Sequence, residues 1–182
     1  MKFSDFELNS AARYVLGIDQ SVTHTGLTLI DKEKEEILIS FGVATHPENC
    51  LEERYLKIKE EIRGVLLKYR QDELVVYIEG LAYSGGNSNN RAILFGLFAV
   101  ILNFLYENNY PYKIIPPKTL KKLFTGNGNA TKQDMLDTLE YNTKERLKEL
   151  SNLKEKSKKF EDIVDSYALA FVGVNQLKTV KK

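Results

Sequence analysis

The sequence predicts an α/β fold in which helices cover both faces of a mixed β-sheet. Short runs rich in β-branched residues alternate with helical patterns along the chain, and the first three runs follow one another without a helix between them. Three consecutive strands form an antiparallel meander, whereas strands joined through helices usually pair in parallel. The 182 residues therefore suit one domain built on one mixed sheet, preceded by a short extension at residues 1–12.

Five runs are predicted as strands because they are short, apolar and rich in Val, Ile, Leu and Thr. They cover residues 13–18, 26–30, 36–43, 73–80 and 112–115. Helices are predicted where apolar residues recur with helical spacing. They cover residues 51–70, 91–108, 116–124, 131–150 and 162–177, with a polar loop at 84–90 and a charged linker or frayed helix at 152–161.

The composition is that of a folded soluble protein, with 28% charged and 43% hydrophobic residues. The single cysteine, Cys50, excludes a disulfide within the chain and favours a reducing compartment. The first 15 residues lack the apolar core of a signal peptide. We therefore expect a cytoplasmic protein.

The longest apolar run covers residues 92–106. A helix needs about 20 apolar residues to cross a bilayer, so this run is expected to form a buried or interface helix and not a membrane span. Within it, Phe95, Phe98 and Leu102 form one stripe. We expect this stripe to contribute both to the core and to a dimer interface.

The net charge of +1 gives no sign of a nucleic-acid partner, but the charges are unevenly distributed. Residues 113–159 carry 12 basic and 6 acidic side chains. Such a basic segment in a neutral chain indicates a local anionic partner. The alternative is a solvated helical surface with scattered lysines.

Four acids occupy positions where a carboxylate is costly unless it finds a partner. Asp19 follows the strand 13–18, and Glu79 ends the strand 73–80. Asp162 and Asp165 are three residues apart at the start of the last helix, and so share one face of it. Any one of them alone is explained as a turn or helix cap. If all four converge, divalent cations would relieve their repulsion, and oxygen ligands suit Mg²⁺ or Mn²⁺.

The segment "TGNGNATK" at 125–132 contains two glycines, Gly126 and Gly128, that permit a tight turn. Backbone amides in such a turn could face a phosphate. The flanking side chains Lys121, Lys122 and Lys132 strengthen that interpretation. The pattern is not a P-loop, because the spacing of its glycines and lysine differs.

Four motifs together resemble those of RuvC-type Holliday junction resolvases, and most closely the phage-encoded branch of that family. The motifs are "GIDQSVTHTG", "YIEG", "PKTLKKLFTGNGNATK" and "DIVDSYALA", and the similarity spans about residues 14–173. The resemblance implies a ribonuclease H-like fold with five central strands, and a homodimer. It implies that four acids are catalytic metal ligands: Asp19, Glu79, Asp162 and Asp165. It also implies that Lys121 and Lys132 contact backbone phosphates, with Lys122 beside them.

The resemblance implies a structure-selective endonuclease in the cytoplasm of a bacterial or phage-infected cell. Its substrates would be four-way junctions and other branched DNA. Two Mg²⁺ ions per site, replaceable by Mn²⁺, would serve hydrolysis of the phosphodiester: one would activate the attacking water, and the other would stabilise the leaving 3′ oxygen. A dimer would place two such sites on symmetric strands of the junction.

The sequence departs from the family pattern after Glu79. The family places an aromatic residue three positions later to help open the junction, but Ala82 stands there and Tyr83 follows. Tyr83 is either a stacking residue for DNA or an ordinary loop or core tyrosine. The segments 84–90 and 140–160 are longer than the minimal pattern, and this leaves junction and sequence preference open.

Two histidines and three hydroxyl residues are assigned no firm role in chemistry. His24 and His46 are interpreted as plain loop residues and not as catalytic groups. Ser21, Thr23 and Thr25 either form a turn or hydrogen-bond near the metals.

Three other functions compete with a junction resolvase. A ribonuclease H-like enzyme acting on RNA–DNA hybrids or flaps is disfavoured by the D-x-x-D ending and the TGNGNATK loop. A non-catalytic DNA-binding protein would gain nothing from four acids at its DNA surface. The segment "GIDQSVTHTG" also resembles the phosphate-binding turn of actin-like ATPases, but the chain is too short for their two lobes.

Overall fold

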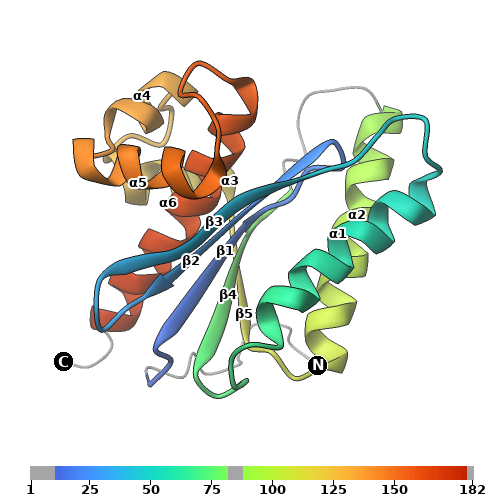
Figure 1. Ribbon diagram of the computed structural model, residues 1–182, viewed down its shortest axis with the longest axis horizontal. Helices are drawn as coiled ribbons and strands as arrows, with labels where there is room; N and C mark the ends of the chain where they lie inside the picture. Colours follow the sequence, from blue (N-terminus) through green and yellow to red (C-terminus); the bar gives the residue numbers. More distant parts are fainter. Residues whose placement is uncertain (1–10, 82–87, 180–182) are drawn as a thin grey trace.

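The computed structural model describes residues 11–81 and 88–179. Five strands form one sheet in the order β3-β2-β1-β4-β5 (Figure 1). Their bounds are β1 Tyr14–Asp19, β2 His24–Asp31, β3 Glu36–Ala44, β4 Leu74–Glu79 and β5 Tyr112–Ile115. All five predicted strands are present, although β2 begins two residues earlier than expected.

The sheet is mixed, as the order of the elements predicts. β1 pairs with β2, and β2 with β3, in antiparallel directions. β1 and β4 are parallel, as are β4 and β5. Because β1 and β4 run in the same direction, their carboxyl ends lie at the same edge of the sheet.

Helices cover both faces of the sheet (Figure 1). The helices are α1 Leu51–Leu66, α2 Ser88–Glu107, α3 Pro117–Thr125, α4 Lys132–Asp137, α5 Tyr141–Ser151 and α6 Lys158–Thr179. α1 and α2 lie on one face, and α6 crosses the other, with α3, α4 and α5 packed against it. This arrangement produces two hydrophobic cores, one on each side of the sheet.

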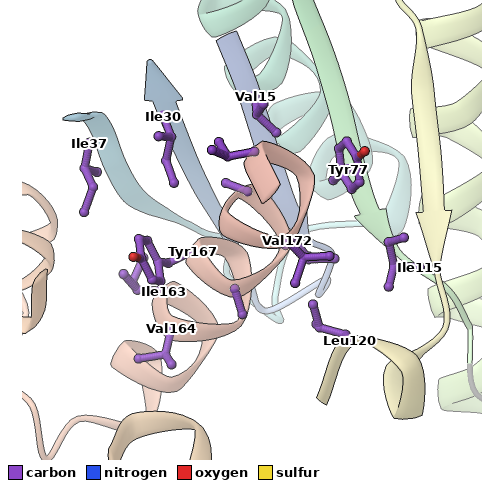
Figure 2. Packing of buried hydrophobic residues seen from close by; sticks show 14 of the residues in the cluster. Val15, Ile30, Ile37, Tyr77, Ile115, Leu120, Ile163, Val164, Tyr167 and Val172 are labelled. Atoms are coloured by element: carbon purple, nitrogen blue, oxygen red, sulfur yellow. The ribbon is translucent and has the colours of Figure 1, made fainter. Parts of the chain in front are cut away.

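The strand period of two divides the central residues between these cores. Val15 and Tyr77 belong to the core under α6, which Figure 2 shows with Ile163 and Val172 of that helix. Leu16, one residue after Val15, belongs to the opposite core with residues of α1 and α2. β1 is therefore buried on both faces.

α6 packs directly against the backbone of β1 and β2 because glycines stand at the contacts. A Cβ at Gly17 would collide with the backbone oxygen of Ser166. A Cβ at Gly26 would collide with the backbone oxygen of Asp162. Only residues without a side chain allow this close approach, and it brings the start of α6 onto the carboxyl end of β1.

The helical region before α6 differs from the prediction. Residues 131–150 form two helices and not one, because Glu140 has an extended backbone that interrupts the helix, while the preceding Leu139 is buried in the core. The segment 152–161, predicted as a charged linker or a frayed helix, is partly helical, since α6 begins at Lys158. Ser157 accepts a hydrogen bond from the Lys159 amide at 3.3 Å, and serine is a preferred residue for starting a helix.

α2 also begins earlier than predicted, at Ser88, so residues 88–90 are helical and not part of a loop. Residues 1–10 and 82–87 lie outside the described part of the chain, and with them Ala82, Tyr83 and most of the predicted extension and loop.

Candidate active site

The four acids singled out in the sequence meet at one edge of the sheet. Ile18 of β1 pairs with Ile78 of β4, so that Asp19 and Glu79, each one residue later, lie on neighbouring strand ends. Asp19 also pairs with Gly26 of β2, which packs against the backbone of Asp162. The parallel pairing and the glycine contact thus bring strand acids and helix acids together.

The capping explanation does not account for these acids. α6 begins at Lys158, so Asp162 and Asp165 lie beyond its first three residues and are not its N-cap. Within residues 11–81 and 88–179, no hydrogen bond from a turn amide reaches the Asp19 carboxylate. The nearby turn is held instead by Thr25, whose hydroxyl donates to the backbone oxygen of Ser21 at 2.6 Å.

Burial and mutual repulsion raise the pKa of three of these acids, Asp19, Glu79 and Asp165. Burial, followed by the charges of Asp165, Glu79 and Asp162, raises the pKa of Asp19 well above its ordinary value. Burial and the charge of Asp165 raise the pKa of Glu79 to about 7. Burial also raises the pKa of Asp165 to about 6, against the opposing charge of Lys132. Without a ligand, the positive charges near the cluster are therefore too few to balance its carboxylates.

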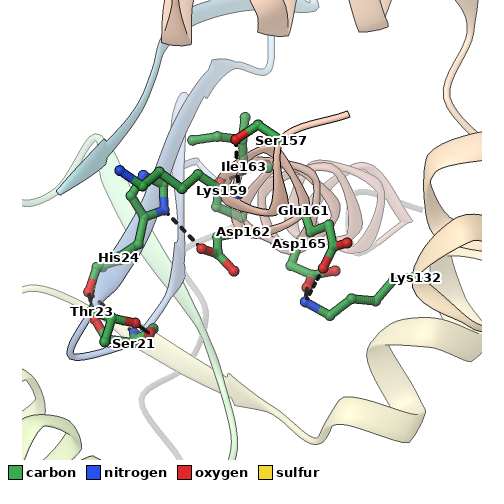
Figure 3. A network of polar contacts seen from close by, with 12 residues as sticks. Ser21, Thr23, His24, Lys132, Ser157, Lys159, Glu161, Asp162, Ile163 and Asp165 are labelled. Atoms are coloured by element: carbon green, nitrogen blue, oxygen red, sulfur yellow. Dashed lines mark hydrogen bonds and ion pairs between the residues drawn. The ribbon is translucent and has the colours of Figure 1, made fainter. Parts of the chain in front are cut away.

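Two basic side chains engage the helix acids (Figure 3). Nδ1 of His24 lies 2.8 Å from Oδ2 of Asp162. Nζ of Lys132 lies 3.0 Å from Oε2 of Glu161 and 3.8 Å from Oδ2 of Asp165. Burial lowers the pKa of Lys132, but the hydrogen bond to Glu161 and the charge of Asp165 raise it overall.

The assignment of His24 to a loop is wrong. His24 is the first residue of β2 and is 6% exposed. One signal in the sequence could have revealed it. His24, Gly26 and Thr28 alternate along one strand face, so extending the predicted strand by two residues turns the histidine towards α6. His46, by contrast, lies in a loop, as predicted, and is exposed.

Lys121 and Lys132 reach the acids from two different helices. Lys132 is the first residue of α4, where Thr131 and Asp134 form a capping box that fixes its position. Lys121 of α3 lies close enough to lower the pKa of Glu79, against the burial that raises it. Lys122 is exposed, and in the described part of the chain it forms no ion pair.

The loop after α3 does not offer the amide cradle that its sequence suggested. Gly126 adopts a left-handed conformation with φ of 83° and donates to the backbone oxygen of Lys122. The amides of Asn127, Asn129 and Ala130 also donate within the loop. These four amides are already satisfied, so the loop does not present the row of free amides that a phosphate cradle needs.

Comparisons with known proteins identify the family of this chain. Residues 15–173 match the family model of the crossover junction endodeoxyribonuclease RuvC. This chain belongs to the RuvC family. The RuvC protein of Petrotoga mobilis is 31% identical over 169 residues, which cover 92% of this chain and 96% of that protein. The Sulfurovum sp. protein is 28% identical, over 92% of this chain and 99% of its own length.

Solved RuvC structures share the fold. Thermus thermophilus RuvC in complex with a Holliday junction substrate aligns with a TM-score of 0.69 and 19% identity, covering 91% of this chain and 96% of that one. Another T. thermophilus RuvC structure gives a TM-score of 0.65 at 21% identity, covering 92% and 96%. The ribonuclease H-like fold implied by the sequence is confirmed.

In the motif "GIDQSVTHTG", the hydroxyl residues after β1 were expected either to form a turn or to hydrogen-bond near bound metals. Ser21, Thr23 and Thr25 hydrogen-bond to one another and to the turn backbone, as turn-forming residues do. Gln20 instead crosses to β4, where its Nε2 donates to the Glu79 backbone oxygen at 2.8 Å. Its Oε1 is buried without a hydrogen-bond partner. An unsatisfied buried oxygen therefore stands beside the acids.

The donor set at this RuvC-family site fits a hard cation by its chemistry. Carboxylate oxygens predominate, and such oxygens bind Mg²⁺ or Mn²⁺. Among the described residues, however, no three His, Cys, Asp or Glu side chains are grouped closely enough to form a ready metal site. Asp162 and Asp165 are turned instead to His24 and Lys132. A cavity of about 170 Å³ opens beside Lys132 and Asp165, between α4 and α6.

Proposed function

We propose that this protein is a metal-dependent endonuclease that resolves four-way and other branched DNA by hydrolysis of phosphodiesters. The observation that carries the proposal is the convergence of Asp19, Glu79, Asp162 and Asp165 beside two lysines. The named relatives are crossover junction endodeoxyribonucleases, and one solved relative was captured with a Holliday junction substrate. Both are properties of those proteins, and they support the same function here.

In this proposal the four acids hold two Mg²⁺ ions, for which Mn²⁺ can substitute. When bound, the ions activate the attacking water and stabilise the leaving 3′ oxygen. The acids contribute negative charge at fixed positions, because all four lie on the rigid elements β1, β4 and α6. The raised pKa values of Asp19, Glu79 and Asp165 indicate that a cation would be bound in exchange for protons.

Lys121 and Lys132 would hold the DNA backbone next to these acids. Lys132 is half-exposed and pairs with Glu161 and Asp165, so a phosphate would compete with these acids for its ammonium group. If a cation neutralises Asp165, the phosphate competes with Glu161 alone for Lys132. Positioning of the scissile phosphate for in-line attack is the contribution we assign to both lysines.

A homodimer through α2 is part of the proposal. Phe95 is 41% exposed, while Phe98 and Leu102 are half-buried at the flank of a core stripe formed by Leu97 and Ile101. The predicted stripe therefore divides between core and surface. A second copy of α2 would cover the apolar side, and the two-fold arrangement would present two sites to the symmetric strands of a junction.

A membrane is the competing explanation of this surface. The apolar helix is longer than its sequence suggested, because α2 has 20 residues. Among the described residues it is the one helix that could cross a membrane by length and composition. We favour the second copy because α2 is one of the two helices covering a face of the sheet and places Leu97, Ile101 and Leu105 in the core.

One set of cleavage assays tests the function. Synthetic four-way junctions, flaps, RNA–DNA hybrids and linear duplexes are incubated with Mg²⁺, with EDTA as the control. Preferred, paired nicking of the four-way junction that EDTA abolishes is the expected result. Preferred cleavage of hybrids would instead establish a ribonuclease H-like enzyme. Junction binding without cleavage, in Mg²⁺ and in Mn²⁺, would establish a binding protein.

A further inference from the structure

One face of β2 holds the acid-bearing helix in place through three alternate residues. His24 contacts the side chain of Asp162, and Gly26 lies against the Asp162 backbone. Oγ1 of Thr28 lies 2.8 Å from Oγ of Ser166, one turn further along α6. α6 is therefore fixed against β2 by contacts on either side of the Asp162 carboxylate.

The buried hydroxyls give this attachment a defined direction. Ser166 donates its one hydroxyl proton to the backbone oxygen of Ile163 at 2.9 Å. Thr28 must then donate to Ser166, and Ser40 of β3, 3.0 Å from Thr28, must donate to Thr28. The chain of donors runs from β3 through β2 into α6, and leaves little freedom for the helix to slide or rotate.

The direction of the hydrogen bond between His24 and Asp162 follows from the chemistry of the carboxylate. An ionised carboxylate only accepts, so His24 presents Nδ1–H to Oδ2 of Asp162 over 2.8 Å. The opposite side of the ring lies over Gly42 of β3, where a Cβ would collide with Nε2. The glycine leaves the space that the imidazole needs, so the ring is held between β3 and α6.

We propose that His24 is a positioning residue, which fixes the carboxylate of Asp162 through Oδ2 and leaves Oδ1 to bind the cation. This inference rests on the proposed function, in which Asp162 is a metal ligand. Outer hydrogen bonds of this kind orient ligating carboxylates, and their loss typically weakens metal affinity or activity by about 10–100-fold. His24 acts through Asp162 and does not itself touch the cation.

Substitutions at position 24 can show whether Nδ1 or Nε2 of the imidazole is the nitrogen that matters. The amide nitrogen of asparagine is attached to Cγ, as Nδ1 is, and can donate from nearly the same place; that of glutamine is one atom further out. We expect His24→Ala and His24→Gln to weaken Mn²⁺ binding by about tenfold or more, measured by calorimetry on the DNA-free protein. His24→Asn should restore most of the affinity. The exposed His46→Ala provides the control for loss of a histidine and should bind like the wild type.

A double substitution tests whether His24 acts through Asp162. If it does, adding His24→Ala to Asp162→Asn should cause no further loss of Mn²⁺ affinity, because the carboxylate it orients is already gone. Additive losses would overturn the proposal. Unchanged Mn²⁺ affinity in the folded His24→Ala protein would also overturn it, as would a nitrogen bound directly to Mn²⁺ in pulsed electron paramagnetic resonance.

A second variant keeps the histidine but disturbs its ring. Gly42→Ala places a methyl group against Nε2 and should reproduce the weakened Mn²⁺ binding of His24→Ala. Wild-type affinity in this variant, with the imidazole displaced from Asp162, would overturn the proposal. Wild-type protein that neither binds Mn²⁺ nor cleaves junctions would refute the proposed function itself, a separate result.

Discussion

Lys132 reaches from the start of α4 to Asp165 of α6, with 3.8 Å between Nζ and Oδ2. The same ammonium group lies 3.0 Å from Glu161. A lysine expected to hold DNA therefore supplies positive charge to the acid cluster in the DNA-free protein. If cation and phosphate load the site as we propose, they must replace these ion pairs, and we expect this exchange to affect both DNA binding and turnover.

Substitution of Lys132 should affect turnover as well as binding. Lys132→Ala should reduce the salt dependence of junction binding by about one counterion and lower the cleavage rate, because the phosphate is then poorly positioned. Lys156→Ala is the matched control: Lys156 is exposed and lies outside every family motif. Binding titrations at several salt concentrations and single-turnover cleavage provide the measurements. If the two variants show the same salt dependence and the same cleavage rate, Lys132 acts only as part of a diffuse basic surface and does not position the phosphate.

Substitution of Asp19 should separate catalysis from folding. Asp19→Asn should reduce junction cleavage below detection while preserving junction binding, because it removes charge and not volume. At pH 8 in EDTA the variant should be more stable by roughly 1 kcal/mol, or about 2–4 °C in melting temperature, since a repelled buried charge is lost. If Asp19→Asn cleaves junctions at the wild-type rate, Asp19 is not a catalytic residue.

The acid cluster should make the metal-free protein less stable as the pH rises from 5 to 8. A carboxyl whose pKa is higher in the folded state binds protons more tightly there, so stability falls between its unfolded pKa and its folded pKa. The folded pKa is about 6 for Asp165 and about 7 for Glu79. Melting temperatures in EDTA should therefore fall across this range, and Mg²⁺ should restore more stability at pH 8 than at pH 5.5.

Glu79→Gln provides the control for this pH dependence, and should flatten it. The Arg13–Asp31 ion pair does not interfere, because its hydrogen bond lowers the pKa of Asp31 below 3.8 and leaves it ionised throughout. A melting temperature that rises from pH 5 to 8 in EDTA would contradict the repulsion described here.

The glycine contact under Asp162 should be sensitive to one added carbon. Gly26→Ala directs a methyl group at the Asp162 backbone and should destabilise the protein by about 1–3 kcal/mol. Gly64→Ala in α1 is the opposite case, since its Cβ would meet nothing within 4 Å. It should stabilise by about 0.4–1 kcal/mol. Denaturant unfolding of both variants tests the pair, and a neutral Gly26→Ala would mean that α6 can move away from β2 at little cost.

The dimer is best tested at a residue that the core does not need. An aspartate at Phe98 would confuse dissociation with misfolding, because Phe98 packs against the core. Ala99 is exposed on the same helix, and Ala99→Glu should yield monomers that keep their stability. Leu67→Glu, at an exposed position after α1, is the control. Sedimentation at micromolar concentration measures both, with and without junction DNA; a monomeric wild type would argue against paired nicking.

The sequence by itself determined the strands, their mixed pairing and which four acids to expect together, two of them at strand ends. Those features follow from local periodicity and from the rule that parallel strands end at the same edge, which is enough to place Asp19 beside Glu79. Helix boundaries depend more on tertiary contacts. The division of residues 131–150 into two helices depends on the packing of Leu139 in the core, and the local sequence pattern does not predict that packing.

Tertiary structure alone decided how the site is held. His24 is far from Asp162 along the chain, and their contact exists because glycines at 17 and 26 let α6 lie directly on β1 and β2. Likewise, the loop amides near Gly126 had the right sequence for a phosphate cradle but already hydrogen-bond within the loop. Sequence patterns specify which groups are available, whereas packing between distant segments determines which partners they reach.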